Sequence, residues 1–375
     1  MSSEFGVNIR FSVFGQSHGR AIGVLIDGLP AGEPIDMEEL AAFMERRRPG
    51  KSRLSTARSE ADRPLILSGV REGRTCGSPL CAMIENADAR SEDYGKLSDT
   101  PRPGHADYTA WAKWGGAADM RGGGHFSGRL TAPLCVAGGI AKQILSRRGV
   151  WVGAHLAEAA GQTDAPLPLR PSAALLAAVA GREMPVLDEE AGARMKEAIL
   201  KAADEGDSVG GIVECAAIGL PAGLGEPMFG GVENRLAAAL FGVPAVKGVE
   251  FGAGFAAARM RGSQDNDPFE VDERGAIRTA SNNAGGILGG ITTGMPLILR
   301  AAVKPTPSIF QPQRTISLSR REAAELRITG RHDPCIAHRA VPVIEAVTAC
   351  VLLDLLHDKP PVLRPGAADE TMTHN

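Results

Sequence analysis

GVREGRTCGSPL at residues 69–80 and GILGGITTGMPL at residues 286–297 share Gly, Gly, Thr, Gly, Pro and Leu at identical spacing. A second motif, GLPAG, precedes each copy, at residues 28–32 and 219–223, and follows a strand-like run both times. Because two motifs recur in the same order, we interpret the chain as an internal duplication that builds two similar sheet units. Chance similarity among turns rich in Gly and Pro is the weaker alternative.

Helix and strand patterns alternate around these repeats. Asp36 with Glu39 forms a capping-box-like start of one helix, and Asp188 opens a second, amphipathic helix. The stretches 130–147 and 337–357 are mostly apolar and long enough to form buried helices. We also expect a helix at 230–242 and strands at 7–14, 20–27 and 246–252. The patterns predict interleaved helices and sheets on an internally duplicated plan.

The chain has 375 residues, which exceeds the size at which a single core usually stops growing. Two domains or a duplicated unit are therefore expected, yet no low-complexity linker divides the sequence. We predict one integrated domain over residues 1–363 and a flexible tail at 364–375. The polar stretch RGSQDNDPFEVDERGA at 261–276 lacks periodicity and predicts a mobile loop or lid.

Composition excludes several classes of protein. The formal net charge of -3 and the aromatic content of 4% argue against a nucleic-acid binder. The six cysteines form no C-x-x-C pair, so we predict reduced thiols and no metal site. The first residues, MSSEFGVNIRFSV, are too polar for a signal peptide, and no apolar run reaches the roughly 20 residues that span a bilayer. We expect a cytoplasmic protein that binds neither membrane nor nucleic acid.

A basic run, ERRRPGKSR at 45–53, stands out in a chain of near-neutral charge. Arginine forks grip phosphate and carboxylate groups bidentately, so the run is typical of a site for a small polyanion. A solvated helix end, whose positive charges complement the helix dipole, is the alternative. The turn at Pro49 and Gly50 favours the binding site, because it lets arginines on the helix and on the loop converge.

Three segments combine the residue types that hold a phosphate and move a proton. GQSHG at 15–19 places Ser17 and His18 in a Gly-flanked turn, where the hydroxyl can orient the imidazole. RGGGHFSGR at 121–129 is a glycine loop that opens into a helix, and loop amides with a helix N-terminus form a phosphate cradle. RHDPC at 331–335 brings Arg, His and Asp to the start of another helix. Because these motifs lie far apart in the sequence, a shared site must draw on both halves. Plain structural turns are the alternative for the first two.

Two other segments offer candidate contacts. RPGHADYTAW at 102–111 sets His105 just before Asp107, a plausible N-cap for a short helix. KPTPSIFQPQRTI at 304–316 is rigid and extended, and SNNAGGILGGITTG at 281–294 supplies backbone almost free of large polar side chains. Such a backbone suits the wall of a site for a flat ring, although a close-packed sheet has the same composition.

The three signature segments, in this order, resemble those of the chorismate synthase family, and the resemblance covers nearly the whole chain. It implies an enzyme that converts 5-enolpyruvylshikimate 3-phosphate into chorismate and phosphate, the last step of the shikimate pathway to aromatic amino acids. It implies a need for reduced FMN without net redox change. It also implies an α+β fold, in which two antiparallel β-sheets sandwich helices (a β-α-β sandwich), and assembly as a homotetramer.

The same resemblance implies roles for individual residues. His18 corresponds to the histidine that protonates the leaving phosphate, and His105 to the one that sets the protonation of reduced flavin. Asp333 corresponds to the aspartate that helps flavin N5 act as base, and Ser17 and Ser127 to serines that relay protons. The implied substrate ligands are Arg48, Arg53, Arg129 and Arg331. The implied flavin contacts are His125, Phe126, Ser127, Ala245, Gly289, Lys304, Pro305, Thr306, Pro307, Ser308 and Arg331. The chain departs from the usual family pattern at Gln16, Pro244 and Pro307.

Two rival functions compete with this interpretation. GAGFAA at 252–257 fits the dinucleotide pattern G-x-G-x-x-A and has Asp272 downstream, which would suit a nicotinamide-dependent dehydrogenase. A polar loop follows where that fold needs a second strand. The other rival is a non-catalytic anion-binding protein, which leaves His18, His105 and Asp333 without a purpose. We therefore predict a monofunctional enzyme that relies on an external flavin reductase or reductant and does not itself use NADPH.

Overall fold

The computed structural model describes residues 3–49, 54–55, 60–86, 99–273, 275–328 and 332–358. Two five-stranded sheets dominate it, and their neighbouring strands pair antiparallel. The first sheet has the order β1 (Glu4–Phe5), β2 (Arg10–Gly15), β3 (Ala21–Asp27), β7 (Leu80–Glu85), β4 (Leu65–Ser68). The second has the order β9 (Gln162–Thr163), β8 (Trp151–Ala159), β10 (Gly211–Ile218), β16 (Leu297–Val303), β11 (Val246–Phe251).

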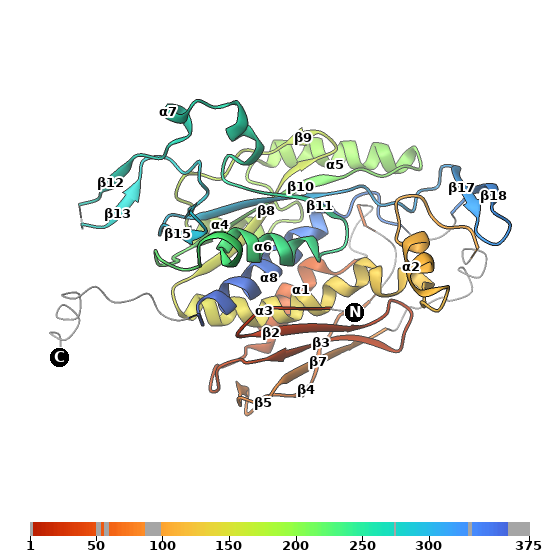
Figure 1. Ribbon diagram of the computed structural model, residues 1–375, viewed down its shortest axis with the longest axis horizontal. Coiled ribbons are helices and arrows are strands. Elements are labelled where there is room, and N and C mark those ends of the chain that lie inside the picture. The colour runs from red at the N-terminus through yellow and green to blue at the C-terminus, as the bar shows by residue number, and fades with distance from the viewer. Residues whose placement is uncertain are drawn as a thin grey trace.

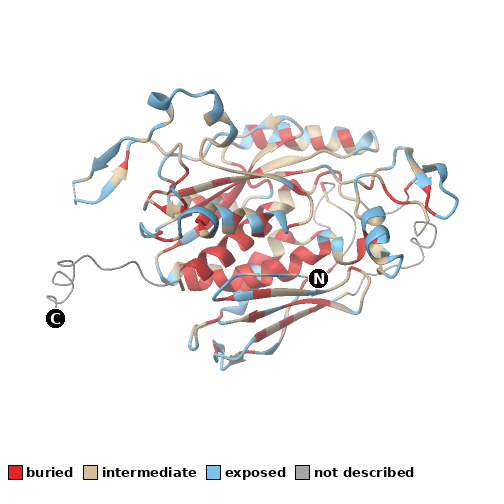
Figure 2. Ribbon diagram, in the orientation of Figure 1, coloured by how far each residue is buried: buried red, intermediate tan, exposed pale blue. Residues whose placement is uncertain are grey.

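A layer of helices lies between the two sheets (Figure 1). Its main members are α1 (Met37–Arg47), α3 (Thr131–Arg147) and α8 (Ala337–Leu355). α3 packs on β3 and β7, α8 packs on β8 and β10, and the two helices pack on each other. Figure 2 shows that α3 and α8 are largely buried, as expected for helices that are apolar around most of their circumference. The predicted α+β class with antiparallel sheets is confirmed.

The contact between α3 and α8 explains one glycine. A Cβ atom added to Gly138 would lie 2.2 Å from the Cα of Ala346, so the two backbones approach too closely for any side chain there. Small residues at both positions let these helices pack at short range, and the centre of the molecule is filled mainly by aliphatic side chains.

Helix starts and core helices were readable from the sequence. Asp36 caps α1 by accepting from the amides of Glu38 and Glu39, and Asp188 caps α5 (Glu189–Asp204). The predictions for α3, α8, α6 (Val232–Phe241), β2, β3 and β11 are confirmed within a few residues. Residues 364–375, predicted to be a flexible tail, lie outside the described residues.

The prediction of an irregular loop at 261–276 was wrong in part. This segment contains α7 (Gly262–Asp265) and β12 (Phe269–Val271), which pairs with β13 (Ile277–Thr279) in a hairpin that projects from the molecule (Figure 1). The polar, aperiodic sequence did not indicate this two-stranded ribbon. Its strands are held by their pairing with each other and not by packing of a buried face.

The two repeated segments occupy equivalent places. Each forms a small hairpin, β5 (Val70–Arg71) with β6 (Arg74–Thr75) and β14 (Ile287–Leu288) with β15 (Ile291–Thr292), and each then enters an inner strand, β7 or β16. β7 pairs with β3 and β16 with β10, which are the strands that end at the two GLPAG motifs. Four strands of each sheet therefore follow the same order, β2-β3-β7-β4 and β8-β10-β16-β11, whereas the edge strands β1 and β9 differ in their place in the chain.

The threonine of the repeat makes the same hydrogen bonds in both copies. Thr75 Oγ1 donates to the carbonyl of Pro30 at 2.5 Å and accepts from the amide of Glu33 at 2.9 Å. Thr292 Oγ1 makes the corresponding bonds, at 2.7 and 2.9 Å, to a carbonyl of the second GLPAG motif and to the amide that follows it. These matched bonds support an internally duplicated plan, which stays a prediction.

No helix within the described ranges is both long and apolar enough to cross a lipid bilayer.

Candidate active site

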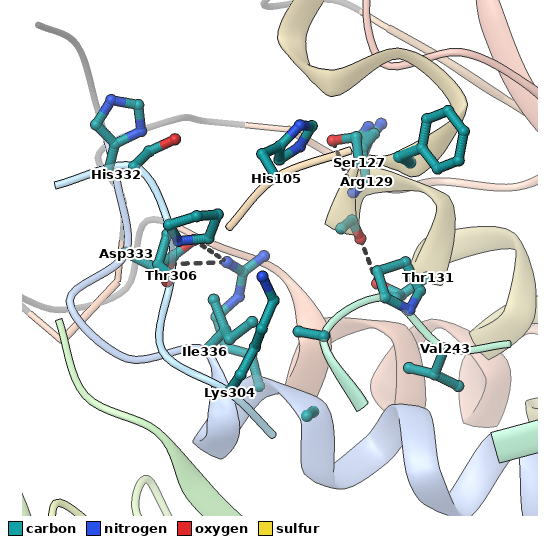
Figure 3. A pocket seen from close by; sticks show the side chains of 18 of the residues that line it. His105, Ser127, Arg129, Thr131, Val243, Lys304, Thr306, His332, Asp333 and Ile336 are labelled. Carbon is teal, nitrogen blue, oxygen red and sulfur yellow. Dashed lines mark hydrogen bonds and ion pairs between the residues drawn. The ribbon is translucent and has the colours of Figure 1, made fainter. Parts of the chain in front are cut away.

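A cavity of about 470 Å³ opens where the helix layer meets the loops between the sheets. Its walls come from the end of α1, from the loops at 102–106 and 122–131, and from the segments 243–245, 304–308 and 332–343. Figure 3 shows His105, Lys304 and Asp333, which belong to three of these segments, around the same space. The expectation that the site draws on both halves of the chain is confirmed.

Most of the residues predicted for the site line this cavity: His105, Phe126, Ser127, Arg129, Ala245, Lys304, Thr306, Pro307, Ser308 and Asp333. Six others are not part of its walls: Ser17, His18, Arg48, His125, Gly289 and Pro305. Arg53 and Arg331 lie outside the described residues.

The glycine loop brings Ser17 and His18 to the edge of the cavity. Gly122, Gly123 and Gly124 have φ angles of +60°, +88° and +55°, in the left-handed region that favours glycine. The loop hydrogen bonds to the other motif through Ser17 N–H and the carbonyl of Gly124, at 3.0 Å. A Cβ atom at Gly122, which lines the cavity, would lie 2.4 Å from His18 Cδ2 and 2.8 Å from Ser17 Oγ. The segments GQSHG and RGGGHFSGR thus pack directly against each other.

His125 supports that loop from behind. Its Nδ1 lies 2.7 Å from the carbonyl oxygen of Gly15 and its Nε2 lies 2.7 Å from Ser3 Oγ. Both ring nitrogens are therefore used to tie the glycine loop to the first sheet.

A buried charge cluster forms the floor of the cavity. Asp62 accepts from Arg47 at 2.5 Å and also from Arg129, whose Nε donates to Asn86 at 3.1 Å. Burial raises the pKa of Asp62, but the two adjacent guanidinium groups outweigh it and hold that pKa below its ordinary value. Burial, with Arg47 close by, lowers the pKa of Arg129, although Asp62 opposes the shift.

The three consecutive arginines of the basic run have different partners. Arg46 donates to Glu345 within the helix layer at 2.6 and 2.8 Å. Arg47 is 3% exposed and lines the cavity. Arg48 caps the end of α1 and pairs with Glu45 at 3.1 Å. Of these three arginines, Arg47 is the one that lines the cavity, and the sequence analysis did not select it. Its signal was helical periodicity, because Arg47 continues the buried face of α1 that carries Leu40, Phe43 and Met44.

Asp333 is held by a second arginine that the sequence analysis did not select. Arg339 Nη1 lies 2.9 Å from each carboxylate oxygen of Asp333, and its Nε donates to the carbonyl of Arg47 at 3.0 Å. His332 follows Arg331 in the same motif, and burial together with the charge of Arg102 lowers the pKa of its imidazole, which favours the neutral form.

His105 belongs to a compact cluster with Arg102 and Asp107. Asp107 was expected to be the N-cap of a helix, and this was wrong, because α2 (Asp107–Trp114) has Ala106 as its N-cap. The carboxylate turns back instead, to His105 Nδ1 at 2.7 Å and to Arg102 Nε at 2.7 Å. Burial raises the pKa of Asp107, but these two hydrogen-bonding partners hold it well below its ordinary value.

Lys304 lines another wall of the cavity. Its amide donates to the carbonyl of Ala245 at 3.0 Å, and its Nζ contacts the carbonyl of Gly104. Burial and the charge of Lys247 lower the pKa of Lys304. Ala245 has a φ of +74°, a strained backbone for a residue with a side chain, and such strain concentrates at functional sites.

The cavity is cationic. Its described lining includes the side chains of Arg47, Arg102, Arg129, Lys304 and Arg339, against the carboxylates of Glu60 and Asp333. A site of this composition suits a small ligand that carries several negative charges.

The family model described as chorismate synthase matches residues 9–357. The chain belongs to the chorismate synthase family. Curated chorismate synthases from Methanosarcina acetivorans and Thermococcus gammatolerans are 50% and 51% identical to it, and these alignments cover 93% and 94% of the chain and 94% and 96% of the two relatives. A solved structure entitled "Crystal Structure of Chorismate Synthase" superposes with a TM-score of 0.74 at 29% identity and covers 94% of this chain and 92% of its own.

As a member of the chorismate synthase family, the chain is an enzyme of the lyase class. The dehydrogenase interpretation is not supported, because a dinucleotide fingerprint needs a strand that leads into a helix within a parallel sheet. GAGFAA instead follows β11, which runs antiparallel to β16, and lies in a turn of 3₁₀-helix (Gly254–Arg259).

Proposed function

We propose that the chain eliminates phosphate from 5-enolpyruvylshikimate 3-phosphate to give chorismate, with reduced FMN as its cofactor. The observation that carries this proposal is the convergence of three distant sequence motifs on one cationic cavity. His105 and Asp333 line the cavity from separate segments, and His18 packs against Gly122, which is part of its wall. Membership of the chorismate synthase family supports this particular reaction for the cavity.

The arginines bind the substrate, because its phosphate and two carboxylates require positively charged partners. Arg129 is the predicted ligand that lines the cavity, and Arg47 joins it from α1. Arg48 lies between the lining residues Arg47 and Pro49 without lining the cavity, so the proposal gives its role to Arg47. Arg53 and Arg331 stay in the proposal through the family resemblance.

The residues present fit FMN. Lys304 and Arg102 line the cavity and offer cationic donors for an anionic ligand, and Ser127, Thr306 and Ser308 add hydroxyl groups to the same walls. The volume of about 470 Å³ falls in the range of roughly 300–1,000 Å³ typical of small-molecule sites. Side chains and backbone of 126–127, 245 and 304–308 would hold the cofactor. When bound, reduced FMN supplies an electron transiently to the allylic system of the substrate and takes it back.

The protein's own groups handle the protons. The elimination breaks the bond between C3 and the phosphate oxygen, and a C6–H bond, and forms a carbon–carbon double bond. His18 is positioned to donate a proton to the departing phosphate, with Ser17 beside it, and Ser127 extends that relay along the cavity wall. Asp333, whose carboxylate accepts a hydrogen bond from Arg339, assists the removal of the C6 proton.

Anaerobic incubation with substrate and photoreduced FMN tests the activity directly. Chorismate and phosphate should appear in equal amounts, and oxidised FMN should give neither. Phosphate release without chorismate would contradict the proposed reaction.

The proposal includes a homotetramer that depends on an external reductase. With oxidised FMN and NADPH alone, the purified protein should form no chorismate, and dithionite or a separate flavin reductase should start turnover without stoichiometric consumption of reductant. Sustained turnover with NADPH alone would overturn the monofunctional assignment. Light scattering of the purified protein would measure its oligomeric state.

A further inference from the structure

The carboxylate of Asp107 lies behind His105, on the side away from the glycine loop. Oδ1 lies 2.7 Å from His105 Nδ1 and 2.8 Å from Arg102 Nη2, and Oδ2 lies 2.7 Å from Arg102 Nε and 3.0 Å from the Arg102 amide. Both partners line the cavity, whereas Asp107 does not. One buried carboxylate thus connects two cavity side chains.

These contacts decide which nitrogen of the imidazole carries a proton. An ionised carboxylate accepts hydrogen bonds and cannot donate them, so the 2.7 Å contact requires a proton on Nδ1 of His105. Arg102 Nη2 is also 3.0 Å from that nitrogen, but it has Asp107 Oδ1 as a closer acceptor at 2.8 Å. When the imidazole is neutral, Nε2 therefore keeps its lone pair.

Nε2 faces the glycine loop. A Cβ atom at Gly123 would lie 3.1 Å from Nε2 and 3.3 Å from Cε1 of His105. The edge of the ring that carries the lone pair therefore lies against the loop whose neighbours Gly122 and Phe126 line the cavity. Asp107 holds the Nδ1 edge, and Arg102 Nη2 lies 3.5 Å from Nε2, which is an acceptor in this tautomer.

We propose that Asp107 is a positioning residue that fixes His105 in the tautomer with a proton on Nδ1, so that Nε2 accepts a proton from the ligand side. The inference rests on the proposed function for its role in turnover, but the tautomer itself does not depend on that function. A paired carboxylate is a known means of orienting an imidazole in enzymes, and its loss reverses the tautomer.

Nitrogen-15 NMR of the protein labelled at histidine tests the tautomer without substrate or cofactor, with His105→Gln used to assign the signal. At a pH where the ring is neutral, the wild-type signal should show a protonated Nδ1 and a bare Nε2. In Asp107→Asn the amide can donate to Nδ1 instead, so the pattern should invert. Asp107→Glu, which restores an acceptor, should return it toward wild type.

Turnover should follow the tautomer. Asp107→Asn should lower kcat by roughly 10²-fold or more, with little change in substrate KM, and Asp107→Glu should recover part of the loss. Asp27→Asn is the matched control, because Asp27 pairs with Arg10 on the surface at 2.7 Å and its side chain is 40% exposed. It should leave kcat unchanged.

Two results would overturn the proposal. One is a wild-type His105 signal with the proton on Nε2, a measurement that needs no variant to fold. The other is Asp107→Asn with an inverted tautomer and wild-type kcat. A wild-type protein that shows the expected tautomer and forms no chorismate would instead contradict the proposed function and support the tautomer assignment.

Discussion

Arg47 and Arg48 are adjacent in the sequence and carry the same side chain in opposite surroundings. Arg47→Ala removes a buried partner of Asp62 from the cavity floor. Losing a charge-assisted contact typically costs about 2–5 kcal/mol, so substrate KM should rise roughly 30-fold or more. Arg48→Ala removes a half-exposed pair with Glu45, which is worth at most about 1 kcal/mol, and should change KM little. Steady-state kinetics of the two variants, under reducing conditions, compares them directly. A larger effect at Arg48 would restore the assignment made from the sequence.

His18 is the second residue whose role can be isolated. His18→Ala should lower kcat about 10²–10⁴-fold, because a general acid no longer protonates the departing phosphate. Binding of reduced flavin should be nearly unchanged. His357→Ala is the control, since His357 Nδ1 bonds to the carbonyl of Leu353 at the end of α8 and the residue does not line the cavity. Near-normal turnover of His18→Ala would show that the acid lies elsewhere.

At the scale of single residues, the sequence predicted which residues lie at the cavity better than it predicted which side chains they contact. Ser127, Arg129, Lys304 and Asp333 could be selected because their motifs are local. Arg339 and Arg102 were missed although their partners Asp333 and Asp107 lie nearby in the chain. The sequence shows that these charges are close along the chain, but only the fold determines which side chains turn toward one another and toward the cavity.

At the scale of elements, the two repeat hairpins allow a paired experiment. Thr75→Val and Thr292→Val keep the shape of the side chain and remove both hydrogen bonds of its hydroxyl. Thr75 and Thr292 are only 4% and 3% exposed. The backbone carbonyl and amide that each hydroxyl bonds would therefore be left without that partner inside the protein. Each variant should lower the free energy of unfolding by about 1–3 kcal/mol.

Chemical denaturation with urea measures this loss, and substitution by serine at each position should restore most of it. Similar losses at both sites would support equivalent hairpins on a duplicated plan. A loss at one site alone would indicate that the shared sequence has different structural roles in the two halves.

Elements with strong local signals were predicted well. Asp36 and Asp188 marked helix starts, and apolar runs marked α3 and α8. The hairpin of β12 and β13 could not be predicted in the same way, because its exposed strands have no buried face to impose alternation. Asp107 was misassigned for a different reason, because its carboxylate bonds to Arg102 and His105 instead of capping α2.

At the scale of the whole molecule, Glu345 connects the helix layer to the second sheet. Its carboxylate lies fully buried on α8 and pairs with Arg46 of α1 and Lys142 of α3, and it accepts from the amide of Ala154 on β8 at 3.2 Å. Burial raises the pKa of Glu345, but its two cationic partners outweigh this and lower it to about 2.

A depressed carboxyl pKa stabilises the folded state above the ordinary value of 4.5, and that contribution is lost as the pH falls from there to about 2. Glu345→Gln should therefore lower the free energy of unfolding at pH 7 by about 3 kcal/mol. The difference from wild type should shrink below pH 4.5 and nearly vanish at pH 2. Denaturation curves at several pH values measure it, and a constant difference down to pH 2 would show that packing, not charge, accounts for the loss.

The position of α8 in the chain has a consequence for biosynthesis. The second sheet is complete by Val303, whereas α8, which packs on its strands β8 and β10, begins at Ala337. A ribosome therefore releases this sheet before it supplies the helix that covers its inner face. Such exposed surface favours aggregation during synthesis, so the nascent chain benefits from a chaperone until residue 355 has left the exit tunnel.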